Sequence, residues 1–286
     1  MLFNRTYVPA DRELLYHYCA PETLLALCSF KTLRFSDVFA MNDFMEVHWG
    51  HQTWEIAAGE VVDTVGKEFL DEIDAIISQS SIQVLPLACC FSRNGDVLSQ
   101  WRAYSADGRG YAVGFDPRLL TQLPIRALKV EYDHRAQIEE VKQFVLALHT
   151  VESEEEVPRA DNFFKACAQL ACDLASFKNP AFLEEDEVRL VHLLNFKNSN
   201  DTLKLVDVGG TSFGVDVPPQ QVKFRMNGST PVAYLDIDFT NGGAVSPIAE
   251  VVLGPKNDSV PSGTSVFLET LSHTGVKIRR SRASYR

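Results

Sequence analysis

The sequence lacks the features that mark membrane, secreted and disulfide-stabilised proteins. No apolar run is long enough to span a bilayer, and residues 1–15 contain no signal-peptide core. The cysteines form no Cys-x-x-Cys pair, and none stands near a histidine at zinc spacing. We therefore expect buried free thiols, no metal site, no membrane association and a reducing, cytoplasmic location. The six cysteines are Cys19, Cys28, Cys89, Cys90, Cys167 and Cys172.

Several familiar catalytic motifs are also missing. There is no phosphate loop, no G-x-G-x-x-G after a strand and no H-E-x-x-H. Residues 210–214 match G-x-S-x-G, but Pro218 and Pro219 disfavour the helix which that motif requires, so we expect a loop. His48 and His51 lie near Glu46 without a third ligand for zinc, which favours a surface pair.

Positive charge is scarce as well, because the 286 residues carry a formal net charge of -11. This balance makes nucleic acid an unlikely partner without excluding it, since a basic cleft could still exist locally. Hydrophobic residues make up 45% and charged residues 23%, which is typical of a globular protein. The length predicts one elaborate domain over residues 1–286.

The order of the predicted elements is mixed rather than a regular alternation of strand and helix, which favours the α+β class. We expect strands at residues 14–19, 32–36, 82–91, 111–115, 127–132, 203–208, 221–226, 232–239, 248–253 and 276–279. Residues 182–194 begin with acids and turn into a further strand. We expect helices at residues 21–30, 47–59, 61–80, 137–149, 161–177 and 265–271, the third of them packed on the sheet.

The chain is organised around residues 98–116, where Trp101, Arg102 and Tyr104 stand close together before a turn and an apolar strand. Aromatic side chains with polar tips at the mouth of a strand are typical of a ligand cleft. The alternative is that Trp101 and Tyr104 cover an edge of the sheet and Arg102 lies on the surface.

Two other polar stretches flank predicted strands. His17 lies between two tyrosines, and alternation along the strand puts Glu185 and Glu187 on one side. Such a carboxylate pair could hold a ribose hydroxyl and stabilise positive charge at an anomeric carbon. His17 could bind a ribose or an amide, and Tyr104 could stack on a flat ring. The alternative for the acidic run is a solvated cap.

Short motifs occur in order along nearly the full length of the chain. The strongest is Leu98-Ser-Gln-Trp-Arg-Ala-Tyr104, continuing to Gly110 and Gly114-Phe115. The others are Leu15-Tyr-His-Tyr18, Phe35-Ser-Asp37, Met41-Asn-Asp43 with Glu46, Cys90-Phe-Ser92, Glu185-Asp-Glu-Val-Arg189, Val251-Val-Leu-Gly-Pro-Lys256 and Ser281-Arg-Ala-Ser-Tyr-Arg286. In these motifs the chain resembles the bacterial and phage DUF2971 family.

That family is in turn distantly similar to the ADP-ribosyltransferase fold of the His-Tyr-Glu kind. The similarity implies a split β-sheet core that binds NAD in a cleft. It also implies that His17, Tyr104 and Glu187 are the catalytic residues. Many members have Thr or Ser two residues after the histidine, where this chain has Cys19, a weaker hydrogen-bonding group.

The resemblance implies an NAD-dependent ADP-ribosyltransferase-like enzyme in a toxin or phage-defence setting, with Glu187 stabilising the oxocarbenium-like state and Glu185 assisting. Trp101 would help to line the cleft. Arg102 or Arg189 would pair with the pyrophosphate, although Arg189 could instead be a structural partner of the neighbouring acids.

Two alternatives stay open: a non-catalytic nucleotide-sensing module, and a hydrolase of NAD or another nucleotide. The sequence names neither an acceptor macromolecule nor an oligomeric state. Asn42, Asp43 and Glu46 would line the cleft or hold its loop, and we favour an Asx-type turn that caps a helix.

Overall fold

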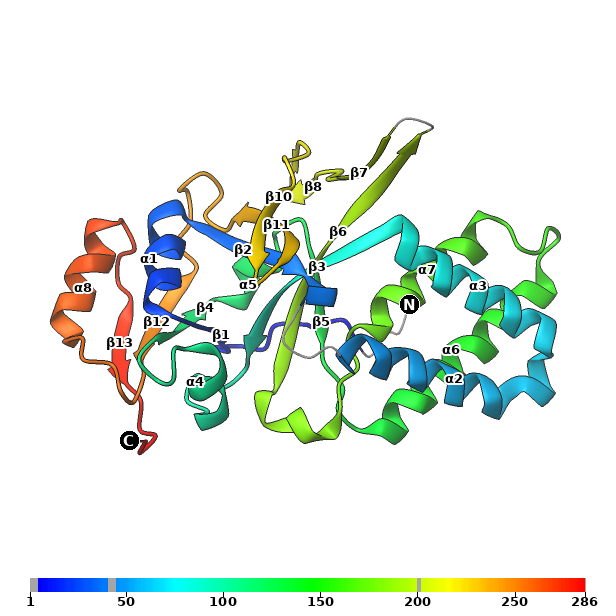
Figure 1. Ribbon diagram of the computed structural model, residues 1–286, viewed down its shortest axis with the longest axis horizontal. Helices are drawn as coiled ribbons and strands as arrows, with labels where there is room; N and C mark the ends of the chain where they lie inside the picture. Colours follow the sequence, from blue (N-terminus) through cyan, green and yellow to red (C-terminus); the bar gives the residue numbers. More distant parts are fainter. Residues whose placement is uncertain (1–4, 41–44, 200–201, 286) are drawn as a thin grey trace.

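The computed structural model describes residues 5–40, 45–199 and 202–285, and it confirms a mixed architecture of helices and one large sheet (Figure 1). A group of helices occupies one end of the molecule, and α8 with β13 lies at the other. The helices are α1 (Pro21–Phe30), α2 (Met45–Val65), α3 (Lys67–Gln83), α4 (Leu98–Tyr104), α5 (Pro117–Leu120), α6 (His134–Glu154), α7 (Asp161–Leu174) and α8 (Pro261–Thr270), with 3-10 turns η2 (Val38–Ala40) and η3 (Pro180–Glu185).

The large sheet follows the order β10-β11-β2-β3-β1-β4-β12-β13, and β6 joins it through β3, with β5 and β7 paired to β6. Among the described pairs, β12 with β13 is parallel and the others are antiparallel. The strands are β1 (Leu15–Cys19), β2 (Thr32–Asp37), β3 (Val84–Ser92), β4 (Tyr111–Phe115), β5 (Arg126–Lys129), β6 (Glu187–Ser199), β7 (Thr202–Val206), β10 (Lys223–Asn227), β11 (Thr230–Asp238), β12 (Ile248–Leu253) and β13 (Lys277–Arg280).

Strand β3 is the point at which the sheet divides. One of its edges pairs with β6 along its whole length. The opposite edge is shared, because β2 pairs with β3 at Leu87 and Ala88 whereas β1 pairs with it at Ser92. Residues 89–91 therefore have no strand partner on that edge within the described registers, and the two strands diverge around them.

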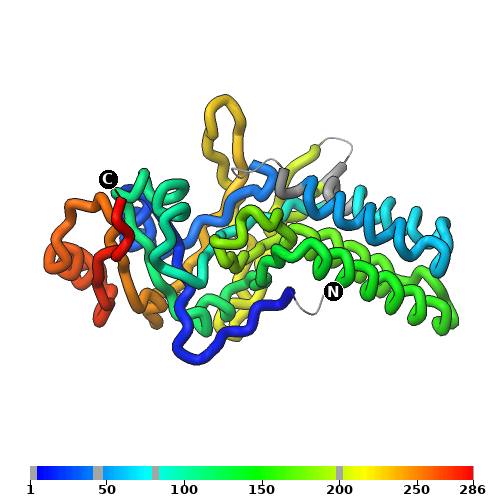
Figure 2. The backbone as a smooth tube through the Cα atoms, turned by 90° about the horizontal axis from the view of Figure 1, so that it is seen from below, coloured from blue at the N-terminus to red at the C-terminus, as the bar shows by residue number. Residues whose placement is uncertain are grey.

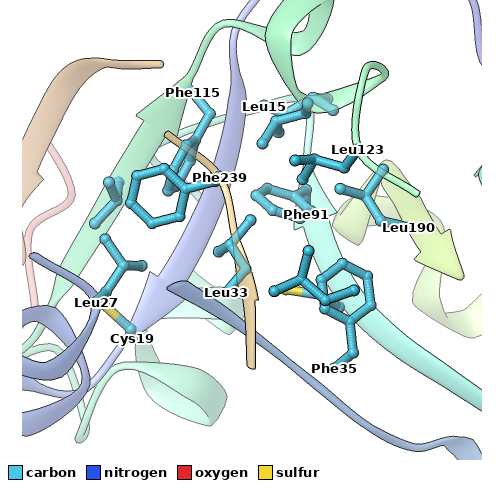
Figure 3. Close-up of a cluster of buried hydrophobic side chains, with 14 of the residues drawn as sticks. Leu15, Cys19, Leu27, Leu33, Phe35, Phe91, Phe115, Leu123, Leu190 and Phe239 are labelled. Atoms are coloured by element: carbon cyan, nitrogen blue, oxygen red, sulfur yellow. The ribbon is translucent and has the colours of Figure 1, made fainter. Parts of the chain in front are cut away.

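In the described part of the chain, two large hydrophobic cores support this arrangement, beside a small cluster around Trp101. The larger core lies under the sheet, where side chains from the strands meet α1 and α8; Leu15, Phe91, Phe115 and Phe239 are at its centre (Figure 3). The second core lies among α2, α3, α6 and α7. Helices α2 and α3 are inserted between β2 and β3, and α6 and α7 between β5 and β6. The helical group is therefore built from two insertions between strands of the sheet.

The helical region requires two corrections to the predicted elements. The break between α2 and α3 falls at Gly66, whose φ of +85° suits glycine, and not near residue 60. Helix α3 contacts chiefly α7 and α2, and only a few residues of the sheet, because Phe69 and Ile73 are buried in the helical core. The 61–80 prediction was therefore wrong in its start and in its main packing partner.

The G-x-S-x-G stretch forms a hairpin of β8 (Gly210–Ser212) and β9 (Val215–Val217) rather than a loop. The cysteines are free, and all are buried except the half-buried Cys90 and Cys172. His51 pairs with Glu55 on an exposed part of α2. In the part of the chain that the structure describes, no helix has the length and apolar character to cross a membrane.

Candidate functional site

A cavity of about 650 Å³ opens where β1 and β2 diverge from the edge of β3. Its volume lies in the range of small-molecule sites. Its wall combines β1, β2 and β3 with α4, with the segment from Lys178 to Arg189 and with β10. The charged and hydrogen-bonding side chains of this wall include His17, Arg34, Asp37, Tyr104, Lys178, Glu185, Glu187, Arg189, Arg225 and Asn227.

An ion-pair cluster forms the β6 side of the cavity. Glu187 is only 5% exposed. Arg189 donates to its two carboxylate oxygens, from Nε at 2.6 Å and from a terminal nitrogen at 3.1 Å. The ammonium of Lys178 lies between the two carboxylates, 2.5 Å from Glu185 and 3.1 Å from Glu187. The register of β6 on β3 sets Glu187 opposite Ser92 and Arg189 opposite Cys90.

The two carboxylates differ in their electrostatics. Burial raises the pKa of Glu187, but Arg189 and Lys178 outweigh burial, so its pKa lies well below the usual range. Burial also raises the pKa of Glu185, and there Lys178 does not fully compensate, so the net shift is upward. Glu187 is thus the fixed anion of the pair, and Glu185 is the carboxylate that takes up a proton more readily.

Tyr104 reaches this cluster from α4. Its side chain is 37% exposed, and its hydroxyl donates to Glu185 at 3.2 Å. Burial, followed by the charge of Glu185, raises the phenol pKa. Helix α4 is anchored by Trp101, which is fully buried against Tyr18 and donates from Nε1 to Asp96 at 2.8 Å.

His17 lies at the unpaired edge of β3. Its Nδ1 is 3.0 Å from the carbonyl oxygen of Cys90, and its ring packs near Phe91. Because a carbonyl oxygen only accepts, Nδ1 carries the proton in this pair. Burial lowers the pKa of the imidazole, which keeps it neutral at neutral pH. Nε2 is then an acceptor for a hydroxyl or an amide N–H.

The structure brings His17, Tyr104, Glu185, Glu187 and Arg189 to one cavity. It does not bring Trp101 or Arg102 there: Trp101 is enclosed beneath α4, and exposed Arg102 lies over the ring of Tyr285, 5.6 Å from its centre. Arg189 is a structural partner of Glu187 and also donates to the carbonyl of Ala175 at 2.7 Å.

Three residues that the sequence placed at the cleft or its loop cannot be compared with the structure. Asn42 and Asp43 lie outside the described residues, as does the side chain of Glu46. Cys19 is buried in the core under the sheet and does not line the cavity, since the strand turns that side chain toward α1. Cys19, the position at which the resemblance implies Thr or Ser, is therefore not part of the cavity wall.

Sequence reasoning missed several cavity residues. Lys178 follows α7 in an unremarkable stretch, and only the tertiary structure sets its ammonium between the two carboxylates. On β10, the alternation of Phe224 and Met226 with Arg225 and Asn227 was a detectable signal, because the second pair faces the cavity. Arg34 alternates in the same way with core residues of β2.

These features define a mixed α/β protein with a polar cavity at a division of its sheet. Residues 100–190 match the family described as "Protein of unknown function (DUF2971)", which confirms the predicted family resemblance over that part of the chain. The matched segment contains Tyr104, Lys178, Glu185 and Glu187, whereas His17 lies outside it. No curated protein and no solved structure matches the chain.

Proposed function

We propose that the cavity binds NAD and that the protein is an ADP-ribosyltransferase-like enzyme. One observation carries the proposal: His17, Tyr104 and the Glu185–Glu187 pair come from three distant stretches of the chain and line the same cavity. An acceptor on imidazole, a phenol and a carboxylate pair suit a ribose next to a positively charged leaving group.

In the proposed reaction, the bond between the nicotinamide nitrogen and the ribose anomeric carbon breaks, and its electron pair leaves with neutral nicotinamide. The oxocarbenium-like centre is attacked by a nucleophile of the acceptor, which loses a proton. Glu187 stabilises the developing positive charge, held in one orientation by Arg189. Glu185, whose pKa is raised chiefly by burial, is the group suited to accept the proton.

The ion pairs of Glu187 favour a second candidate, a non-catalytic module that senses a nucleotide. Lys178 and Arg189 formally balance the charges of Glu185 and Glu187. A balanced cluster can recognise ribose hydroxyls without stabilising a cationic transition state as strongly as a free carboxylate. An NAD hydrolase is the same chemistry with water as the acceptor.

Mass spectrometry of NAD incubated with the purified protein and a cell lysate tests the proposal. We expect nicotinamide release by the parent protein and by Glu184→Gln, an exposed control, and release reduced by about a hundredfold or more in Glu187→Gln. Glu187→Gln could lose activity by misfolding, so Tyr104→Phe, which removes only a hydroxyl at the same site, serves as a second test variant. The folded fraction of each variant is measured by thermal unfolding.

Macromolecules of the lysate that carry ADP-ribose would identify a transferase, and free ADP-ribose alone would identify a hydrolase. NAD binding without nicotinamide release would identify the sensor. If the parent protein neither binds nor cleaves NAD, the proposal is wrong.

A further inference from the structure

Strand β10 of the β10–β11 hairpin adds Arg225 and Asn227 to the wall of the cavity. Figure 2 shows this hairpin (gold) projecting from the body of the molecule. Strand β10 is an edge strand that pairs only with β11 among the described strands. Its alternation exposes Phe224 and Met226 on one face and directs Arg225 and Asn227 to the cavity.

Arg225 differs from the other cations of the cavity in its surroundings. Lys178 and Arg189 are engaged by the buried carboxylates. Arg34 is held by Asp236 at 2.9 Å and stacks on the ring of Tyr234. The backbone of Arg225 pairs with β11, but within the described ranges of the chain no hydrogen bond or ion pair joins its guanidinium to a protein group, although the protein as a whole carries a net charge of -11.

We infer that Arg225, assisted by the amide of Asn227, binds the phosphate groups of the ligand. This deepens the proposed function and rests on it for the identity of the ligand. A guanidinium fork matches phosphate oxygens, and an amide N–H₂ adds a neutral donor. The inference also orients the ligand: its anionic part lies under the β10–β11 hairpin, and its ribose and leaving group lie at His17, Tyr104 and Glu185.

The assignment replaces the predicted phosphate partners. Arg102 lies outside the cavity, and Arg189 is engaged by Glu187. The cavity would thus be selective for nucleotides that carry phosphate over the corresponding nucleosides, because a nucleoside leaves the guanidinium without its anion.

Calorimetric titration of the full chain with NAD and with nicotinamide riboside, which has no phosphate, tests the inference. We expect Arg225→Ala to weaken NAD binding by about tenfold or more and nicotinamide riboside binding by less than about twofold. Arg225→Lys should retain part of the NAD affinity. The matched control is Arg102→Ala, which removes the same charge outside the cavity and should change neither affinity by more than about twofold.

The inference is overturned if Arg225→Ala weakens both ligands equally, or affects NAD no more than Arg102→Ala does. Titration with inorganic pyrophosphate separates it from the proposed function. Pyrophosphate binding that Arg225→Ala abolishes, in a protein that does not bind NAD, would preserve the phosphate site and reject the NAD proposal.

Discussion

Glu187 remains charged in a buried position because two cations contact it. Arg189 follows it on β6, and Lys178 approaches from the end of α7. Removing one member of such a buried group leaves the remaining charges without a partner. The loss of folding free energy is then larger than the net contribution of the intact group. The site therefore contains a carboxylate that is fixed in both charge and orientation.

Glu187→Gln should destabilise the fold by about 3 kcal/mol at pH 7, as measured by urea unfolding. In the unfolded chain this carboxyl titrates near pH 4.3, and its pKa is lowered in the folded protein despite burial, by Arg189 and Lys178. Its contribution is therefore complete above about pH 4.3 and is lost as the pH falls.

The difference between the parent protein and Glu187→Gln should accordingly narrow by roughly 1–2 kcal/mol at pH 3. Glu184→Gln, an exposed neighbour, should differ from the parent by less than about 0.5 kcal/mol throughout. A difference that stays constant from pH 7 to pH 3 would show that Glu187 is not held as an anion.

At the scale of elements, two glycines in α2 have opposite surroundings. A Cβ at Gly50 would lie 2.6 Å from the backbone carbonyl oxygen of Leu174 at the end of α7, whereas a Cβ at Gly59 would meet nothing within 4 Å. Gly50 thus permits the close approach of α2 to α7, the helix that precedes Lys178. Gly59 is exposed and serves no such contact.

Gly50→Ala should destabilise the protein by about 1–3 kcal/mol, since a backbone atom of α7 must move. Gly59→Ala should stabilise it by about 0.5–1 kcal/mol, because alanine favours a helix interior. Urea unfolding of both variants measures the two changes in the free energy of unfolding. Equal effects would mean that α2 and α7 do not approach each other at Gly50.

At the scale of the whole molecule, the cavity brings together segments that lie far apart in the chain. Lys178 continues from α7, Glu187 begins β6, and His17 belongs to β1. A ligand in the cavity would contact several of these segments at once, so its binding energy would be added to the stability of the folded chain.

NAD at about a hundred times its dissociation constant should stabilise the parent protein by about 2.7 kcal/mol and raise the unfolding midpoint by roughly 5 °C in thermal scans. Arg225→Ala should show a smaller rise at the same NAD concentration because its affinity is lower. A midpoint that does not depend on NAD concentration would contradict binding at this cavity.

Most elements were predictable because their patterns are local. The apolar run of β3, the proline at the start of α1 and the turn before β4 are readable from the residues alone. The approach of His17, Tyr104 and Glu187 was predicted only through a family resemblance, since nothing in their spacing requires it.

The sequence by itself determined which segments become strands and helices, and it supplied the polar residues of β1, α4 and β6. Only the tertiary structure decided which of these residues share a cavity. Trp101 and Tyr104 lie on one short helix, yet one is enclosed and the other reaches Glu185. Lys178 joins the site because the chain between α7 and β6 turns back on itself, and Arg225 joins it because a distant strand packs beside β1, β2 and β3; neither contact leaves a periodic trace in the chain.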